Sequence, residues 1–227
     1  MHAKLVKWTQ DPERTCAVAA MYSVKESVPD SLFTEADYEK AMAVLKRVIA
    51  SGHHSVLEHA SFTFNVSGVS RALTHQLVRH RIASYTQQSQ RYVKLKDRGY
   101  VTPKSIESSG FASEYHSMVE KISAFYQRML DGKIAAEDAR YILPNAAHTS
   151  IVITMNAREL IHFFSLRSCN RAQWEIRALS DEMLRQCKEA APALFANAGP
   201  GCIRGPCPEG EWTCGKPRNA EALFKKA

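Results

Sequence analysis

A change of hydrophobic period in the first third of the chain constrains the fold more than any other sequence feature. Phe62, Phe64 and Val66 alternate with polar residues, which is typical of a strand with one buried face. Ser70 then offers an N-cap for a helix that runs to about Arg79. A strand that buries only one face needs a second layer against it, so this pattern predicts a sheet packed by helices.

Hydrophobic periodicity predicts the remaining elements. These are a first strand over 1–8, a β-branched strand over 150–154, and helices over 15–22, 35–51, 113–130, 135–141, 156–167 and 171–190. Residues 82–92 are too polar for a core and too aromatic for a flexible linker. We expect an α+β fold in which residues 1–198 form a single domain, with a central, mainly antiparallel sheet and long C-terminal helices. A tail containing Gly, Pro and Cys follows over 199–227.

The net charge narrows the choice of partners. The 227 residues carry a formal net charge of +7, which favours anionic partners without separating nucleic acid from nucleotides or phosphorylated cofactors. Two segments are rich in arginine: Arg71, Arg79, Arg81, Arg91 and Arg98 in the first, and Arg158, Arg167, Arg171 and Arg177 in the second. Arginine can hold phosphate through two hydrogen bonds, so these clusters suit a small anion pocket or a solvated basic face.

The sequence carries no signal for a membrane or for secretion. No apolar run approaches the ~18 residues of a spanning helix, and the N-terminus lacks the apolar segment of a secretory signal. We therefore expect a cytoplasmic protein, whose six cysteines are thiols. Cys202, Cys207 and Cys214 could instead bind zinc or form a disulfide, but the usual C-x2-C pairs are missing and we assign no metal site.

One short segment combines cationic and hydroxyl side chains. Arg79, His80 and Arg81 are consecutive, and because neighbours on a helix lie ~100° apart, they would grip different groups around a ligand. Ser89 and Arg91 would point the same way in an extended segment. A hydroxyl, a backbone N–H and a guanidinium form a reasonable phosphate cradle. The alternative is a basic helix end that complements its own dipole.

The same segment resembles the signature of a known enzyme family. Arg79-His80-Arg81, then seven residues, then Ser89 is the signature of the flavin-dependent thymidylate synthases, and the surrounding residues are similar to it as well. Three further stretches resemble family motifs in the family's order: 52–64, 139–144 and 156–176. The resemblance extends over residues 15–195.

The resemblance implies a reaction, an assembly and two binding sites. It implies reductive methylation of dUMP to dTMP, with methylenetetrahydrofolate as carbon donor, FAD as hydride carrier and NADPH as reductant, in a homotetramer with shared active sites. The residues implied for dUMP are Gln76, Arg79, Gln87, Ser89, Gln90, Arg91, Arg140 and Arg167, with Ser89, Arg91 and Arg140 around the phosphate. The residues implied for FAD are His53, Ser55, Glu58, Arg79, His80, Arg81, Ile82, Gln87, Asn156, Arg158, His162, Leu166 and Arg171. Arg167 is implied as the catalytic group that faces the uracil ring.

The implied chemistry suits these residue types. Methylation at C5 of uracil requires negative charge that spreads onto O4 and N3, and one fixed guanidinium beside it is worth ~3 kcal/mol of barrier. Arg167 would supply that contact, so Cys169, two residues away, is expected to be incidental rather than a nucleophile. No G-x-G-x-x-G fingerprint occurs, so we expect a non-Rossmann FAD site.

Two further details concern the implied FAD site. Arg158, His162 and Leu166 are spaced by four residues, which predicts one helix face that is polar, then cationic, then apolar. Position 87 is Gln where many family members carry Glu, so a role that needs a carboxylate there is lost, although the amide can still hydrogen-bond a flavin or uracil.

Two other functions compete for the same residues. A zinc hydrolase would use His54, Glu58 and His59, but the inverted zincin pattern needs a His at position 55, where Ser55 stands. A nucleic-acid-binding module without catalysis would use the basic charge and the tyrosines among the arginines. No recognised binding motif supports that reading, and we expect no nucleic-acid partner.

Overall fold

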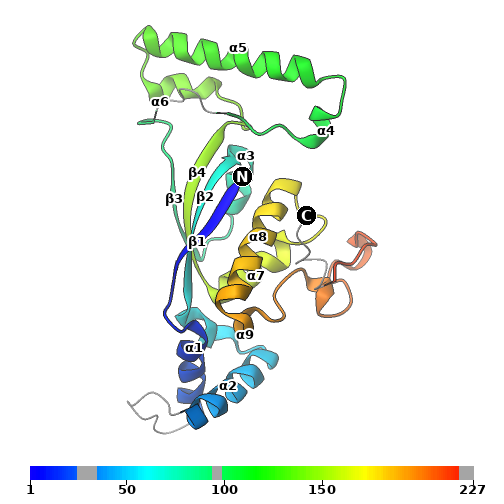
Figure 1. The fold of residues 1–227 in the computed structure, drawn as a ribbon. Coiled ribbons are helices and arrows are strands. Elements are labelled where there is room, and N and C mark those ends of the chain that lie inside the picture. The colour runs from blue at the N-terminus through cyan, green and yellow to red at the C-terminus, as the bar shows by residue number, and fades with distance from the viewer. Residues whose placement is uncertain (25–34, 94–98, 220–227) are drawn as a thin grey trace. The chain divides into compact units, whose positions relative to one another are not determined.

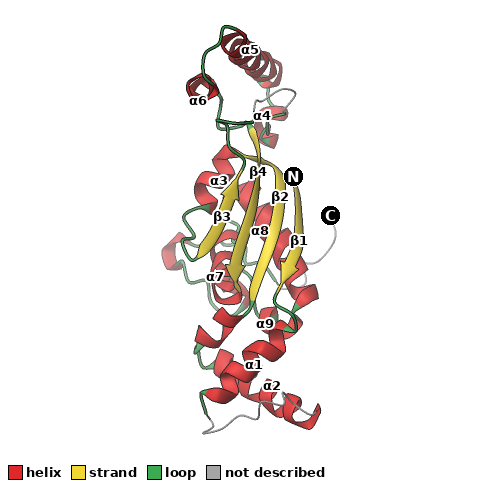
Figure 2. Ribbon diagram, turned by 90° about the vertical axis from the view of Figure 1, so that its left-hand side faces the viewer, coloured by secondary structure: helices red, strands yellow, loops and turns green. Residues whose placement is uncertain are grey.

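A computed structural model of the chain describes residues 1–24, 35–93 and 99–219, which form an α+β fold around a four-stranded sheet. The strands are β1 (His2–Trp8), β2 (Ser61–Ser70), β3 (Ala83–Gln87) and β4 (His148–Asn156). They lie side by side in the order β1-β2-β4-β3 with antiparallel neighbours (Figure 2). The predicted α+β class and mainly antiparallel sheet are confirmed.

Helices connect and follow the strands (Figure 1). The α-helices are α1 (Pro12–Tyr22), α2 (Glu35–Ala50), α3 (Arg71–Leu77), α4 (Lys104–Glu107), α5 (Ala112–Asp131), α6 (Ala136–Ala139), α7 (Ala157–Arg167), α8 (Trp174–Ala190) and α9 (Pro192–Phe195). The 3₁₀ turns are η1 (His54–His59), η2 (Arg140–Ile142), η3 (Gly201–Ile203) and η4 (Gly210–Trp212). All predicted long helices are present, and the described part of the tail contains only the two short turns η3 and η4.

The predicted and observed elements differ mainly at their ends. Ser70 caps α3 as predicted, because its hydroxyl accepts a hydrogen bond from the Leu73 N–H at 3.0 Å. The helix ends at Leu77, so Arg79 lies beyond it rather than within it. The first helix starts at Pro12, earlier than predicted, since proline fits the first turn of a helix.

Three short elements escape the sequence prediction. β3 presents polar residues on both faces, and it lies at the edge of the sheet, where hydrophobic alternation is not required. The helices α4 and α9 have four residues each, which is too short for a helical period to be recognised.

The described residues divide into two compact units. Unit 1 contains Met1–His2, Val66–Arg79 and Tyr85–Val152, and unit 2 contains Ala3–Asn65, His80–Ser84 and the residues from Ile153 onward. The predicted boundary at residue 198 stays a prediction. In unit 1 the buried side chains come mainly from α3, β4 and α5, with Leu73, Leu77, Ile151 and Tyr126 fully buried.

An aromatic cluster forms the core of unit 2 and supports α7. The Phe195 ring of α9 packs edge-to-face against two other rings. The distance between ring centroids is 5.3 Å to Phe62 of β2 and 6.0 Å to Phe164 of α7. All three side chains are fully buried, and such ring pairs add about 0.5–1.5 kcal/mol each beyond area burial. This packing holds α7, which carries several predicted site residues, against the sheet.

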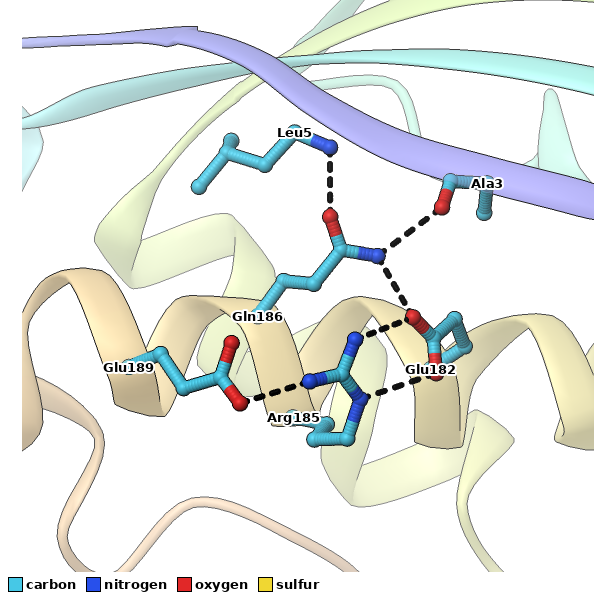
Figure 3. Close-up of polar contacts among 6 residues, drawn as sticks. All are labelled: Ala3, Leu5, Glu182, Arg185, Gln186 and Glu189. Carbon is cyan, nitrogen blue, oxygen red and sulfur yellow. Dashed lines mark hydrogen bonds and ion pairs between the residues drawn. The ribbon is translucent and has the colours of Figure 1, made fainter.

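A side-chain amide fastens the edge strand β1 to α8. Gln186 accepts a hydrogen bond from the Leu5 N–H at 2.6 Å and donates to the Ala3 carbonyl at 2.9 Å (Figure 3). Glu182 accepts a second bond from the Gln186 amide at 2.7 Å and pairs with Arg185 through both carboxylate oxygens. Gln186 is therefore held in place from its own helix while it bonds the backbone of the strand.

Candidate active site

Helix α7 of unit 2 begins with a side-chain cap at Asn156. Asn156 accepts a hydrogen bond through Oδ1 from the Glu159 N–H at 2.9 Å, which satisfies one of the free donors of the first turn. Arg158, His162 and Leu166 follow along the helix, and all three are exposed. The predicted helix is confirmed, and its geometry places these three side chains on one face.

A chain of three polar side chains lies behind this face. His80 is 5% exposed, and its Nδ1 lies 3.1 Å from Oε1 of Glu159. On the other side, Nε of Arg167 donates to Nε2 of His80 at 3.1 Å. Because a guanidinium nitrogen can only donate, Nε2 is the acceptor. The ring proton therefore lies on Nδ1, which donates to Glu159.

Burial keeps the His80 ring neutral. Desolvation, followed by the positive charges of Arg167 and His162, lowers the pKa of His80 to about 4. Burial also raises the pKa of Glu159 and lowers the pKa of Arg167. The close contact between His80 and Glu159 is therefore a hydrogen bond from a neutral imidazole rather than an ion pair, and the free lone pair of that ring holds Arg167.

The turn η1 brings a carboxylate to α7. Glu58 Oε1 lies 2.5 Å from Arg158 NH1, and both side chains are about half exposed. His53 and Ser55 are exposed at the start of the same turn. The structure therefore brings together two residues implied for FAD, Glu58 and Arg158, which are 100 positions apart in the sequence.

Two exposed aliphatic side chains accompany these polar groups in unit 2. Ile82, which follows the exposed Arg81, is 65% exposed, and Leu166 is 44% exposed. Exposed aliphatic side chains can pack against the apolar ring of an amphipathic ligand, while neighbouring cations bind its charged groups.

Arg171 lies under the C-terminal tail. The predicted helix over 171–190 begins only at Trp174, where Gln173 caps α8, so Arg171 belongs to the connection before it. Its NH1 donates to the Trp212 carbonyl at 2.5 Å, and its guanidinium lies over the Trp212 ring at 6.0 Å. Arg218 pairs with Asp181 at 2.9 Å. These contacts fasten the tail to the rest of unit 2.

The tail encloses a cavity of about 260 Å³ beside Arg171. Four cysteines are among the residues that line it: Cys169, Cys202, Cys207 and Cys214. All are free thiols. Across residues 1–24, 35–93 and 99–219, no three His, Cys, Asp or Glu side chains are grouped in a way that could hold a metal ion.

Unit 1 carries the arginines implied for the phosphate. Arg91 pairs with Glu137 at 2.8 Å, and Arg140 donates through Nε to the Glu137 carbonyl at 3.0 Å. Ser89 accepts a hydrogen bond from the Arg91 N–H at 3.1 Å, and the Val93 N–H bonds the Ser89 carbonyl at 3.1 Å. The extended geometry expected here is wrong: the serine hydroxyl competes for the backbone donor and closes a turn.

Arg71 is a residue whose position the sequence did not reveal. Its NH2 donates to the Gln88 carbonyl at 2.8 Å, and its Nε is buried without a hydrogen-bond partner among the described residues. Burial lowers the pKa of Arg71, and the positive charge of Arg140 lowers it further. The Ser70 cap was the available signal, because it fixes Arg71 at the first position of α3. Arg98, in the same arginine-rich segment, lies outside the described residues.

The remaining residues implied for dUMP also lie in unit 1. Gln87 donates through Nε2 to the hydroxyls of Thr74 and Thr149 at 3.0 and 3.2 Å, so its carbonyl oxygen is its remaining polar group. Gln76 lies on α3 with its amide nitrogen 3.5 Å from the Ala72 carbonyl. Gln90 is half-buried and Arg79 is exposed. Arg167, which the resemblance also implies for dUMP, belongs to unit 2.

Comparisons with known proteins agree on one family. Residues 4–193 match the family model described as thymidylate synthase complementing protein. A flavin-dependent thymidylate synthase of Geobacter sulfurreducens is 50% identical over 231 residues, covering 100% of this chain and 99% of the relative. Enzymes of the same name from Clostridium tetani and Pyrococcus abyssi are 44% and 45% identical, covering 97% and 91% of this chain and 96% and 89% of the relatives.

No described helix of this chain has the length and apolar character needed to cross a membrane.

Proposed function

The chain belongs to the flavin-dependent thymidylate synthase family, and on that premise we propose how its own residues divide the work of methylating dUMP to dTMP with FAD. The carbon comes from methylenetetrahydrofolate and the reducing power from NADPH. The main support for this assignment of roles is the hydrogen-bonded chain from Glu159 through His80 to Arg167. In this chain a neutral, buried imidazole orients one guanidinium.

The phosphate of dUMP binds the arginines of unit 1. Arg71, Arg91 and Arg140 supply three positive charges: Arg91 pairs with the Glu137 carboxylate, Arg140 bonds the Glu137 backbone carbonyl, and the charge of Arg140 acts on Arg71. The pair between Arg91 and Glu137 is about half exposed on both sides, and such a pair is worth only about 0–1 kcal/mol. A phosphate can therefore take over Arg91, since charge-assisted bonds to phosphate are stronger. Ser89 orients the turn that carries Arg91.

The pyrimidine ring of dUMP forms hydrogen bonds with glutamines of unit 1. The Gln87 amide nitrogen is held by two threonine hydroxyls, so its carbonyl oxygen is the group offered to a ligand N–H. A glutamate at this position would accept bonds from the same hydroxyls instead. Gln76, Gln90 and Arg79 complete the proposed contacts with the nucleotide.

The polar residues of unit 2 fit FAD by their chemistry. Arg81, Arg158 and His162 are exposed cationic or cationisable groups suited to a pyrophosphate, and Ile82 and Leu166 offer apolar surface to a ring. The other residues proposed for FAD are His53, Ser55, Glu58, Asn156, Arg171, Arg79 and Gln87. A site on a turn and a helix face is non-Rossmann. When bound, FAD supplies the hydride that completes the methyl group.

Arg167 stabilises the charge that develops on uracil. Negative charge at C5 spreads onto O4 and N3, and a guanidinium held beside the ring lowers the energy of that state. Its orientation matters as much as its charge, because a group that is already fixed needs no reorganisation during the reaction. His80 is a positioning residue for Arg167, and this explains why both of its ring nitrogens are occupied within unit 2.

The assembly and the location complete the proposal. A homotetramer with shared active sites would let the dUMP residues of one chain and the FAD residues of another form a single pocket. The expected cytoplasmic location and the absence of a nucleic-acid partner stay predictions.

Release of tritium from dUMP labelled at C5 tests the reaction. The purified protein is expected to release tritium when FAD, methylenetetrahydrofolate and NADPH are all present, and to lose this activity when FAD is removed. Arg167→Ala should bind dUMP and FAD but release little tritium. Absence of release in every mixture, in a protein that is colourless after purification, would favour the binding-module alternative.

A further inference from the structure

Four of the six cysteines of the chain line one cavity, and the proposed reaction uses none of them. Cys169 precedes α8, whereas Cys202, Cys207 and Cys214 belong to the tail (orange to red in Figure 1). All four are half-buried, so a small molecule can reach them. Accessible thiols gathered on a segment with little regular structure point to thiol chemistry rather than to packing.

The other two cysteines behave as ordinary core residues. Cys16 and Cys187 are fully buried. Burial raises the pKa of the Cys16 thiol to about 12, and it also raises the pKa of the Cys187 thiol well above its usual value. Since the thiolate is the reactive form, these two side chains are inert toward oxidants. The chain therefore separates two inert thiols in the core from four accessible thiols around the cavity.

Two of the four sulfurs lie against the same short segment. Cys214 Sγ accepts a hydrogen bond from the Lys216 N–H at 3.4 Å. Cys202 Sγ accepts one from the Arg218 N–H, also at 3.4 Å. Only Pro217 separates the two donors in the sequence. The segment 216–218 therefore holds the sulfurs of Cys202 and Cys214 at adjoining positions.

The segment 216–218 is fixed, but its bonds to the sulfurs are weak. The Asn170 amide donates to the Lys216 carbonyl at 2.8 Å, and Arg218 donates to the Ser168 carbonyl at 2.6 Å. Sulfur, by contrast, is only a weak hydrogen-bond acceptor. Each sulfur can therefore leave its N–H donor at low cost, and the cavity of about 260 Å³ gives it room to rotate.

The backbone between Cys202 and Cys214 can also adjust. Residues 203–213 contain the end of η3 and the turn η4, without an α-helix or a strand. Gly205 and Gly210 have φ values of 152° and 53°, a region that residues with a side chain disfavour. A disulfide requires its two Cα atoms to lie within about 7 Å, and a segment of turns and glycines can adapt to that requirement with less strain than a helix or a strand.

We propose that Cys202 and Cys214 form a reversible disulfide, which makes the tail a site of thiol oxidation. The oxidant is a small disulfide, RSSR, such as oxidised glutathione. The thiolate of one cysteine attacks RSSR to give a mixed disulfide and RSH, and the second thiolate attacks the protein sulfur of that mixed disulfide and releases the other RSH. The protein loses two protons and two electrons, and RSSR takes up both as two molecules of RSH.

The disulfide closes a loop that carries Trp212. The Trp212 carbonyl accepts the hydrogen bond from Arg171, so this loop holds one end of a contact between the tail and the rest of unit 2. Cross-linking reduces the conformational freedom of the residues inside a loop. Oxidation therefore fixes residues 203–213, and reduction releases them. The inference rests on the tail thiols and not on the roles assigned to the active-site residues.

Peptide mapping of the full-length protein tests the pairing. The protein is equilibrated with mixtures of reduced and oxidised glutathione, its remaining thiols are alkylated, and it is digested without a reductant. Trypsin cleaves after Arg204 and separates Cys202 from the other two tail cysteines, and cleavage after Glu209 and Glu211 separates Cys207 from Cys214. Mass spectrometry should find the Cys202 peptide joined to the Cys214 peptide, through a bond that dithiothreitol removes.

Two serine variants identify the thiols that react. Cys214→Ser should abolish the cross-link to Cys202. Cys207→Ser is the matched control, because it removes a thiol that lines the same cavity and should leave the cross-link intact. Circular dichroism checks that both variants are folded. A cross-link at Cys202 that survives Cys214→Ser, or that disappears in Cys207→Ser, would show that the proposed pair is wrong.

Digestion of the folded protein tests the effect on the tail. Trypsin cleavage after Arg204, inside the loop, should be several-fold slower in the oxidised parent than in the reduced parent. Cys214→Ser should be cleaved at the same rate after both treatments. Equal rates in the oxidised and reduced parent would mean that the disulfide does not fix the loop.

Two further results would overturn the inference, whatever the enzyme does. If Cys202 forms no disulfide in any glutathione mixture, the tail is not a site of thiol oxidation. If the purified protein holds one zinc ion per chain that Cys202→Ser and Cys214→Ser release, the thiols are metal ligands instead. FAD binding and tritium release, measured in the same samples, report separately on the catalytic assignment.

Discussion

Arg91 of unit 1 and Arg167 of unit 2 are held in opposite ways. Arg91 shares an exposed carboxylate, Glu137, that an incoming anion can displace. Arg167 is half-buried and bonded to a neutral imidazole that a buried carboxylate orients in turn. The Arg91 guanidinium can therefore exchange its carboxylate partner for a bound anion. The Arg167 guanidinium, by contrast, is held in one orientation that a ligand cannot easily change.

This difference matches two different tasks. A phosphate is held mainly by its attraction to positive charges, and this attraction falls off only gradually with distance, so the exact position of each arginine matters little. Stabilising a transition state requires a donor at one place, because only interactions that strengthen during the reaction accelerate it. We therefore expect substitutions in unit 1 to change mainly KM for dUMP, and substitutions along the Glu159–His80–Arg167 chain to change mainly kcat.

The largest effect should follow from Arg167→Ala. Loss of a donor that stabilises developing charge typically costs about 10²–10³ in kcat, and we expect that loss here with dUMP affinity changed by less than about tenfold. Steady-state tritium release and dUMP titration measure the two quantities. Arg167→Lys keeps the charge but not the fixed plane, so recovery of full kcat by lysine would contradict the argument from direction.

Arg140→Ala should give the next largest effect, and of the opposite kind. Removal of one charge-assisted bond to the phosphate is expected to raise KM for dUMP by roughly 10–100-fold, since such bonds contribute about 1.5–3 kcal/mol. The kcat at saturating dUMP should stay within about threefold of the parent. Glu137→Gln is a useful companion, because it frees Arg91 from its carboxylate and should lower KM. If Arg140→Ala lowered kcat and left KM for dUMP unchanged, the proposed difference between the arginines of unit 1 and Arg167 would be wrong.

His80→Asn should have a smaller effect on the rate, together with a signature in pH. We expect kcat to fall by roughly tenfold, because Arg167 loses the bond that aims it. The pKa of His80 is lowered from 6.5 in the unfolded chain to about 4, so its contribution to stability is present above about pH 6.5 and lost as the pH falls toward 4.

That contribution amounts to about 3 kcal/mol over the whole window. Thermal unfolding between these pH values should show a weaker pH dependence in His80→Asn than in the parent. The raised pKa of Glu159 acts in the opposite direction, and Glu159→Gln should therefore steepen the dependence. Equal slopes in the parent and in His80→Asn would mean that the imidazole is not neutral in the folded protein.

Cys169→Ser should have the smallest effect. The thiol lines the cavity under the tail rather than the chain that holds Arg167, and serine is close to it in size. Turnover should stay within about twofold of the parent. Loss of turnover with FAD still bound would restore the cysteine as a nucleophile.

The sequence predicted what depends on local periodicity. Ser70 before an amphipathic run predicted the cap of α3, and the spacing of Arg158, His162 and Leu166 predicted a shared face once α7 was recognised. These predictions succeeded because a cap and a helix repeat involve only residues within a few positions of one another.

The sequence could not predict contacts that the fold creates between distant segments. Glu159 reads as an ordinary acidic residue in the first turn of a helix, yet it is buried against His80, which is 79 positions away. The pair between Arg91 and Glu137 spans 46 positions. The tail shows no periodicity at all, and its attachment through Arg171 and Arg218 depends on side chains that reach backbone and acid groups elsewhere.

The bonds from Gln186 to the backbone of β1 also bear on how the protein behaves when it is concentrated. An uncovered outer strand offers its N–H and C=O groups to strands of other molecules, which is a common route to aggregates. Here the Leu5 donor and the Ala3 acceptor are already occupied by an amide from α8. A strand from a neighbouring molecule would have to displace that amide first. Gln186 therefore disfavours the pairing of β1 with strands of other molecules.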